Sequence, residues 1–121
     1  MSVLLSPKEL HEQLDKVVVL DARGFDAYEA AHIPGAFVID MDAHMSGLLG
    51  VHGGRHPLPD MSVLANRLSE CGVTMDSPIV VCDAWISFAG RLRFLLLYMG
   101  FTNVKVLAGG IERWHREGYP L

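Results

Sequence analysis

The feature that most constrains the fold of this chain is a set of three short runs of apolar, mostly β-branched residues. They are KVVVLDA at residues 16–22, SPIVVCDA at residues 77–84 and NVKVLAGG at residues 103–110. Each run is nearly continuous in hydrophobicity and does not alternate between apolar and polar positions. Strands of a parallel sheet show this pattern because helices cover both faces of such a sheet. The three runs therefore predict the centre of a parallel sheet.

Helical patterns lie before and between these runs. The segment 6–14 begins with a Ser-Pro-Lys-Glu capping signature, and the segments 61–71 and 91–99 each carry leucines and end next to a glycine. Together with a shorter strand pattern at residues 36–40, this alternation predicts an α/β fold. We expect a central parallel sheet of about five strands with helices on both faces. We also expect one domain over residues 1–121, because no linker or internal repeat divides the chain.

In a sheet of this kind, functional sites form beyond the carboxyl ends of the strands. Asp21, Asp83 and the pair Gly109–Gly110 each follow a predicted strand. The segment from Asp42 to Asp60, rich in glycine and histidine, is long for a connection between packed elements. Zinc ligands usually include thiolates or carboxylates at tighter spacing than its histidines have, so we expect no metal site.

Composition excludes several classes of function. The chain has 121 residues and a formal net charge of −4, which leaves no basic surplus to hold nucleic acid. No apolar stretch approaches the roughly 20 residues that span a bilayer, and the N-terminus lacks a signal-peptide pattern. Two cysteines, Cys71 and Cys82, are too few for a disulfide framework and suit a reducing compartment. We therefore expect a cytoplasmic protein that binds neither nucleic acid nor membrane.

Several motifs resemble those of a known family. The stretches VVVLDARGFDAYEAAHIPGAFVID at residues 17–40 and VKVLAGGIERWHREGYPL at residues 104–121 resemble the rhodanese-like domains, and the likeness covers nearly the whole chain. The segments GGRHPLP at residues 53–59 and AGR at residues 89–91 resemble the N-terminal halves of two-domain thiosulfate and mercaptopyruvate sulfurtransferases. The resemblance implies sulfur-transfer chemistry that needs neither a metal nor an organic cofactor.

In the family, as the resemblance implies, a strand runs into a tight loop that opens with a cysteine and wraps around its sulfur. A helix begins directly after this loop. Backbone N–H groups of the loop and the positive end of the helix stabilise a thiolate and then a persulfide, which lowers the pKa of the cysteine. The thiolate takes sulfur from a small donor and passes it to an acceptor.

Counting residues along the chain places Asp83, and not Cys82, at the position of this nucleophile. Asp83 stands five residues after Pro78 and seventeen before Gly100, the spacing that the resemblance implies for the cysteine of active members. A carboxylate fits the amide cradle but has no sulfur with which to accept a sulfane atom. Cys82 is then a small buried residue at the end of a strand. The alternative, a register shifted by one residue that makes Cys82 the nucleophile, stays open.

The loop after Asp83 supplies a second group of candidates. The candidate substrate loop consists of Ala84, Trp85, Ile86, Ser87 and Phe88. Its large apolar side chains stand where active relatives carry small or basic residues, which indicates a surface that packs against a partner. Alternatively, Trp85 covers the core of its own domain. Arg55 and His56 are candidate interface residues, because their segment resembles one that leans toward the active site of a partner domain.

Other polar residues of the family motifs have structural roles in our interpretation. Asp21 and Arg23 resemble a pair in which the acid caps a loop and the arginine forms ion pairs. His32 lies in a turn and is expected to bond to backbone atoms, since buried histidines are usually satisfied in this way. Arg91, at the start of a predicted helix, is expected to form an ion pair.

Three functions compete. The first is a rhodanese-like domain that does not catalyse alone and serves as an N-terminal half or as a binding or regulatory module. Its partner would be a second rhodanese-like domain or another protein. The second is an active single-domain thiosulfate sulfurtransferase that uses Cys82 as its persulfide-forming nucleophile on a small sulfur donor and acceptor. The third, a phosphatase or arsenate reductase on the same fold, would need an arginine where Phe88 stands.

Overall fold

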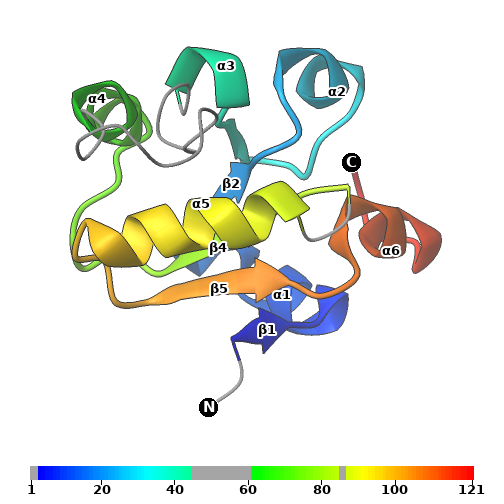
Figure 1. The fold of residues 1–121 in the computed structure, drawn as a ribbon. Helices are drawn as coiled ribbons and strands as arrows, with labels where there is room; N and C mark the ends of the chain where they lie inside the picture. Colours follow the sequence, from blue (N-terminus) through cyan, green and yellow to red (C-terminus); the bar gives the residue numbers. More distant parts are fainter. Residues whose placement is uncertain (1–2, 45–60, 85–86) are drawn as a thin grey trace.

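The structure, a computed structural model, describes residues 3–44, 61–84 and 87–121 of the chain. Its centre is a five-stranded sheet of order β1-β5-β4-β2-β3 in which every pair of neighbours is parallel (Figure 1). The predicted α/β fold with a parallel sheet is confirmed. The strands are β1 (Leu4–Leu5), β2 (Val18–Asp21), β3 (Phe37–Val38), β4 (Ile79–Cys82) and β5 (Val104–Leu107).

Helices cover both faces of the sheet. One apolar cluster joins the sheet to α4 and α5, and a second joins the opposite face to α1 and α6. In Figure 1, α5 lies across β4 and β5, and α4 stands on the same side. The helices are α1 (Pro7–Glu12), the 3-10 helix η1 (Leu14–Lys16), α2 (Phe25–Ala30), α3 (Met41–His44), α4 (Ser62–Glu70), α5 (Ser87–Tyr98) and α6 (Gly110–Arg116).

Local sequence signals account for the start of α1. The Ser6 hydroxyl accepts the Glu9 amide at 3.1 Å, and the Ser6 amide donates to the Glu9 carboxylate at 3.0 Å. This reciprocal capping box satisfies two backbone donors of the first turn. The helix places Leu10, which is fully buried, in the core.

The alternation of side chains along β4 decides which core each residue joins. Ile79 and Val81 belong to the cluster under α4 and α5, whereas Val80 and Cys82 belong to the cluster under α1 and α6. All four are buried, as expected for a central strand of a parallel sheet. The strand therefore ends with Cys82 directed away from α5.

The helix after β4 begins earlier than its pattern of leucines predicted. The predicted segment started at residue 91, whereas α5 starts at Ser87 and runs to Tyr98. Its first turn lies beyond the carboxyl end of β4, next to Asp83. No helix in the described part of the chain is long and apolar enough to cross a membrane.

Candidate functional site: the loop after strand β4

Asp83 is the first residue after β4, and its carboxylate binds the start of α5. The side chain is 5% exposed. Its Oδ1 accepts the Ala84 amide at 2.6 Å, and its Oδ2 accepts the amides of Phe88 at 2.8 Å and Ala89 at 3.3 Å. Phe88 and Ala89 lie in the first turn of α5, where helix amides lack intrahelical partners and the helix dipole is positive. The carboxylate thus occupies an anion-binding position made of three backbone amides.

Cys82 precedes Asp83 but lies in a different environment. It pairs with Asp21 of β2 in the sheet register and is 0% exposed. Burial raises the pKa of the Cys82 thiol well above its usual range, and the charge of Asp21 raises it further. Arg23 opposes this effect, and Asp83 adds to it. The thiol is therefore protonated and enclosed in the core at neutral pH.

The start of α6 holds the loop from the other side. The Ile111 amide donates to the Asp83 carbonyl at 2.8 Å. Gly110 has a φ of +68°, and a Cβ built there would lie 2.5 Å from the carbonyl oxygens of both Asp83 and Ala84. Only glycine permits this backbone conformation and this close approach without strain. Gly110 of the LAGG motif therefore lets the start of α6 approach the loop backbone.

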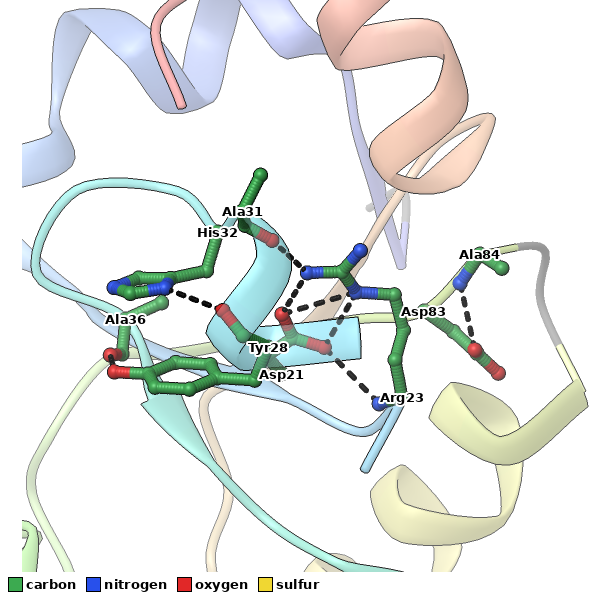
Figure 2. A network of polar contacts seen from close by, with 8 residues as sticks. All are labelled: Asp21, Arg23, Tyr28, Ala31, His32, Ala36, Asp83 and Ala84. Carbon is green, nitrogen blue, oxygen red and sulfur yellow. Dashed lines mark hydrogen bonds and ion pairs between the residues drawn. The ribbon is translucent and has the colours of Figure 1, made fainter. Parts of the chain in front are cut away.

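A buried ion pair lies beside the loop. Asp21 is fully buried and accepts three hydrogen bonds from the guanidinium of Arg23 (Figure 2). Nε donates to Oδ1 at 3.0 Å and to Oδ2 at 3.1 Å, and Nη2 donates to Oδ2 at 2.7 Å. The Arg23 Nη2 also donates to the Ala31 carbonyl at 2.6 Å. The hydrogen bond to Asp21 raises the pKa of Arg23 against the opposing effect of burial. Asp83 lies on the other side of the Arg23 side chain in Figure 2, and its charge makes a smaller contribution to the raised pKa of Arg23.

The predicted turn histidine is bound to backbone atoms. His32 Nδ1 lies 2.7 Å from the Tyr28 carbonyl, and the two rings stack with centroids 3.8 Å apart (Figure 2). The Tyr28 hydroxyl donates to the Ala36 carbonyl at 2.5 Å. These contacts close the turn between α2 and β3, and they give His32 the bond to backbone that the sequence predicted.

The structure brings together part of the predicted site. Asp83, Ala84 and Phe88 form the head of the loop, and Ser87 is the first residue of α5. The Phe88 side chain is exposed, so the face predicted to be an interface has one described apolar member. The other predicted members lie outside the described residues: Trp85 and Ile86 of the loop, and Arg55 and His56 of the GGRHPLP segment.

Two contributors to this site were not predicted from the sequence. The Ala89 amide was not expected to bind Asp83, because the leucine pattern placed the helix start too late. The contact of Gly110 with the loop depends on tertiary packing, although the glycine pair itself signalled an unusual backbone.

Among the described residues, no group of three or more histidine, cysteine, aspartate or glutamate side chains could hold a metal ion.

The described chain is a parallel α/β domain whose central strand β4 is followed by a carboxylate that binds amides at the N-terminus of α5. The Rhodanese-like domain family matches residues 6–117, and the chain belongs to this family. The resemblance seen in the sequence is thereby confirmed.

Proteins that are similar to this chain include sulfurtransferases. The putative thiosulfate sulfurtransferase SseB of Mycobacterium tuberculosis is 34% identical over 96% of this chain and 45% of that protein. The probable 3-mercaptopyruvate sulfurtransferase of Pseudomonas aeruginosa is 36% identical over 98% of this chain and 46% of that protein. The crystal structure of SseA from Escherichia coli superposes with a TM-score of 0.79 at 28% identity, over 100% of this chain and 51% of that one. The chain spans about half the length of these relatives and matches about their N-terminal half. Nothing in these relatives supports the phosphatase or arsenate reductase alternative.

Proposed function

We propose that this rhodanese-like domain does not transfer sulfur through its own loop, and that it acts as a non-catalytic half or a binding module beside a catalytic partner. The observation that carries the proposal is the position of the Asp83 carboxylate. It accepts the amides of Ala84, Phe88 and Ala89, the groups that would otherwise stabilise a thiolate or a persulfide. The cradle is filled by a group of the chain itself.

The chemistry of sulfur transfer explains why this arrangement blocks the reaction. A cysteine thiolate attacks the outer sulfur of thiosulfate, the S–S bond of the donor breaks, and sulfite leaves with the bonding electron pair. The enzyme then holds the outer sulfur as a persulfide. Asp83 cannot form this bond, and its negative charge repels an anionic donor. Cys82 has the required sulfur, but it is fully buried and its thiol pKa is raised.

Partner identity is proposed from the relatives. They are two-domain proteins of which this chain matches about half. A second rhodanese-like domain that carries its own loop cysteine is therefore the proposed catalytic partner, and its small sulfur donor and acceptor would bind there. The face that includes Phe88, and for which Arg55 and His56 are further candidates, would lie toward that partner.

Sulfur transfer on the isolated chain tests the proposal. We would measure thiosulfate:cyanide sulfurtransferase activity, together with the intact mass after thiosulfate treatment, on the wild type, Cys82→Ala and Cys71→Ala. We expect no added sulfur on the wild type and no activity above that of Cys82→Ala. A wild type that gains one sulfur at Cys82 and turns over, with activity lost in Cys82→Ala but kept in Cys71→Ala, would make Cys82 the nucleophile.

A gain-of-function variant tests the cradle directly. Asp83→Cys in the Cys82→Ala background places sulfur where three amides converge. Because those amides and the start of α5 stabilise an anion, we expect a thiol that ionises near neutral pH and takes up one sulfur from thiosulfate. Asp83→Ser in the same background is the matched control, since it has a similar size and no sulfur. A variant cysteine that reacts no faster than a free thiol would argue against the cradle.

A further inference from the structure

Asp40 links the starts of two short helices. Its Oδ1 accepts the amide of Phe25, the first residue of α2, at 3.3 Å, and its Oδ2 accepts the Ala43 amide of α3 at 2.9 Å. A Cβ added at Gly24, directly before α2, would lie 3.2 Å from the same Oδ1. The two helices lie side by side where they follow β2 and β3 (Figure 1). One carboxylate therefore joins them.

The neutral ring of His44 completes this link. Its Nδ1 lies 2.8 Å from the backbone nitrogen of Asp40, which can only donate, so Nδ1 accepts and carries no proton. The half-buried ring also meets the Phe25 ring edge to face, with centroids 5.7 Å apart. His44 thus bonds to α3 and packs against α2. We call Phe25, Asp40, Ala43 and His44 the α2–α3 link.

A second histidine shows the opposite arrangement. His32 Nδ1 faces the Tyr28 carbonyl at 2.7 Å, so it donates, and it still donates when the other ring nitrogen is protonated. Protonation of His32 therefore costs no hydrogen bond to the backbone. Protonation of His44 at Nδ1 sets two N–H donors against each other, because the Asp40 amide already points at that nitrogen. Of these two histidines, His44 is the one whose bond acid breaks.

The charged groups around His44 come from two parts of the fold. Helix α4 packs against α3 and brings Arg67 and Glu70, and the Asp40 carboxylate acts on the ring from the start of α3. Helix α2 contributes the uncharged ring of Phe25. Burial and the charge of Arg67 lower the pKa of His44, and they outweigh the opposing effects of Asp40 and Glu70. The ring is therefore neutral in the fold near neutral pH.

We propose that His44 is a proton-operated switch that releases α3 from α2 in acid. A proton from the solvent binds Nδ1, the Asp40 amide loses its acceptor, and the charged ring turns away from that amide and from Phe25. The first residue of α2 then loses the ring that packs against it. Because α2 starts two residues after Arg23, the change occurs next to the buried ion pair of Arg23 with Asp21. The inference does not depend on which residue accepts sulfur.

NMR of the full chain between about pH 8 and pH 5 tests the proposal. At the alkaline end we expect a nuclear Overhauser effect between the ring protons of His44 and Phe25. It should be lost in acid, and the Phe25 amide should shift with the same midpoint as the His44 ring. The amide of Val81, in the core strand β4, should not shift and so reports that the fold stays intact. A ring contact that persists once His44 is charged, or a Phe25 amide that does not titrate, would overturn the proposal.

Matched substitutions at the two histidines assign the effect. His44→Asn places an oxygen that accepts the Asp40 amide and does not titrate, so the pH-dependent shift of the Phe25 amide should disappear. His32→Asn places an amide nitrogen that donates to the Tyr28 carbonyl, and this variant should keep the shift of the wild type. A shift that persists in His44→Asn would assign it to another group, such as the Asp40 carboxylate, and would contradict the switch.

Discussion

Cys82 and Asp83 are neighbours in the chain, yet their side chains lie toward opposite sides of the sheet. The Cys82 thiol is buried in the cluster that faces α1 and α6, whereas the Asp83 carboxylate binds amides at the start of α5. The alternation of a strand causes this separation, because successive side chains point to opposite faces. A shift of one residue therefore exchanges a core thiol for a loop carboxylate.

The Asp83 carboxylate should stabilise the fold as well as fill the loop. Asp83→Ala removes the acceptor of the Ala84, Phe88 and Ala89 amides, and Ala89 is buried. We expect the free energy of unfolding to fall by about 1–2 kcal/mol, as for the loss of a helix cap. Urea unfolding monitored by circular dichroism measures the change. Asp76→Ala, at an exposed acid, should stay within about 0.5 kcal/mol of wild type. Equal midpoints for the two variants would contradict the capping role.

Substitutions at two glycines, Gly35 and Gly110, allow the energetic cost of backbone strain to be measured separately from that of a close contact. Gly110 and Gly35 both have positive φ, +68° and +81°. A Cβ at Gly110 would lie 2.5 Å from two carbonyl oxygens, whereas nothing lies within 4 Å of one at Gly35. We expect Gly35→Ala to cost roughly 1 kcal/mol from backbone strain alone. Gly110→Ala should cost roughly 3 kcal/mol or more, because the loop carbonyls must move as well. If urea unfolding gives the same loss of unfolding free energy for Gly35→Ala and Gly110→Ala, the loop carbonyls can move away from the new Cβ at no measurable cost.

The central strands were predictable because burial on both faces leaves a plain signal in the sequence. The strands β2, β4 and β5 each contain valine, leucine or isoleucine at three of their four positions. The edge strand β1 has only two residues, Leu4–Leu5, too few to show a pattern. Its pairing with β5 follows from tertiary packing.

The position of Asp83 after β4 was predictable from the sequence. The contacts that hold the loop in place were not. Counting from Pro78 and Gly100, with the spacing that the family resemblance implies, predicted Asp83 at the head of the loop. The start of α5 at Ser87 depends on a carboxylate four residues earlier in the chain, a signal that lies outside the usual capping position. The contact of Gly110 with Ala84 joins residues far apart in sequence, so no local pattern contains it.

Alkaline pH should destabilise the fold through Cys82. Burial raises its thiol pKa in the folded state, so above the unfolded pKa of about 8.5 the unfolded chain loses a proton that the folded chain keeps. The protonated Cys82 thiol makes its full contribution to the free energy of unfolding below that pH. The contribution is lost as pH rises toward the folded pKa, by at most about 1.4 kcal/mol per pH unit. Urea unfolding between about pH 7.5 and 10 measures the slope.

The comparison that isolates Cys82 uses a background without the second buried cysteine. Cys71 also has a raised pKa, chiefly from burial, so both proteins should carry Cys71→Ala. Cys82→Ala in that background should show a shallower alkaline decline than its parent. It should also lose about 1 kcal/mol at neutral pH from the cavity left by the sulfur. Parallel alkaline slopes would mean that Cys82 ionises as readily in the folded chain as in the unfolded one.

His44 should produce the opposite pH dependence on the acid side. Its Nδ1 accepts the Asp40 amide at 2.8 Å, so that nitrogen carries no proton in the fold. Burial lowers the pKa of His44, and the charge of Arg67 lowers it further, against the opposing effects of Asp40 and Glu70. A lowered folded pKa means that the stability contribution is present above the unfolded pKa of about 6.5 and is lost as pH falls through the folded value. Titration of the ring protons by NMR should give a midpoint below 6.5, and the α3 amides should shift with it because protonation breaks the bond to Asp40. A midpoint at or above 6.5 would show that the bond does not hold the neutral ring.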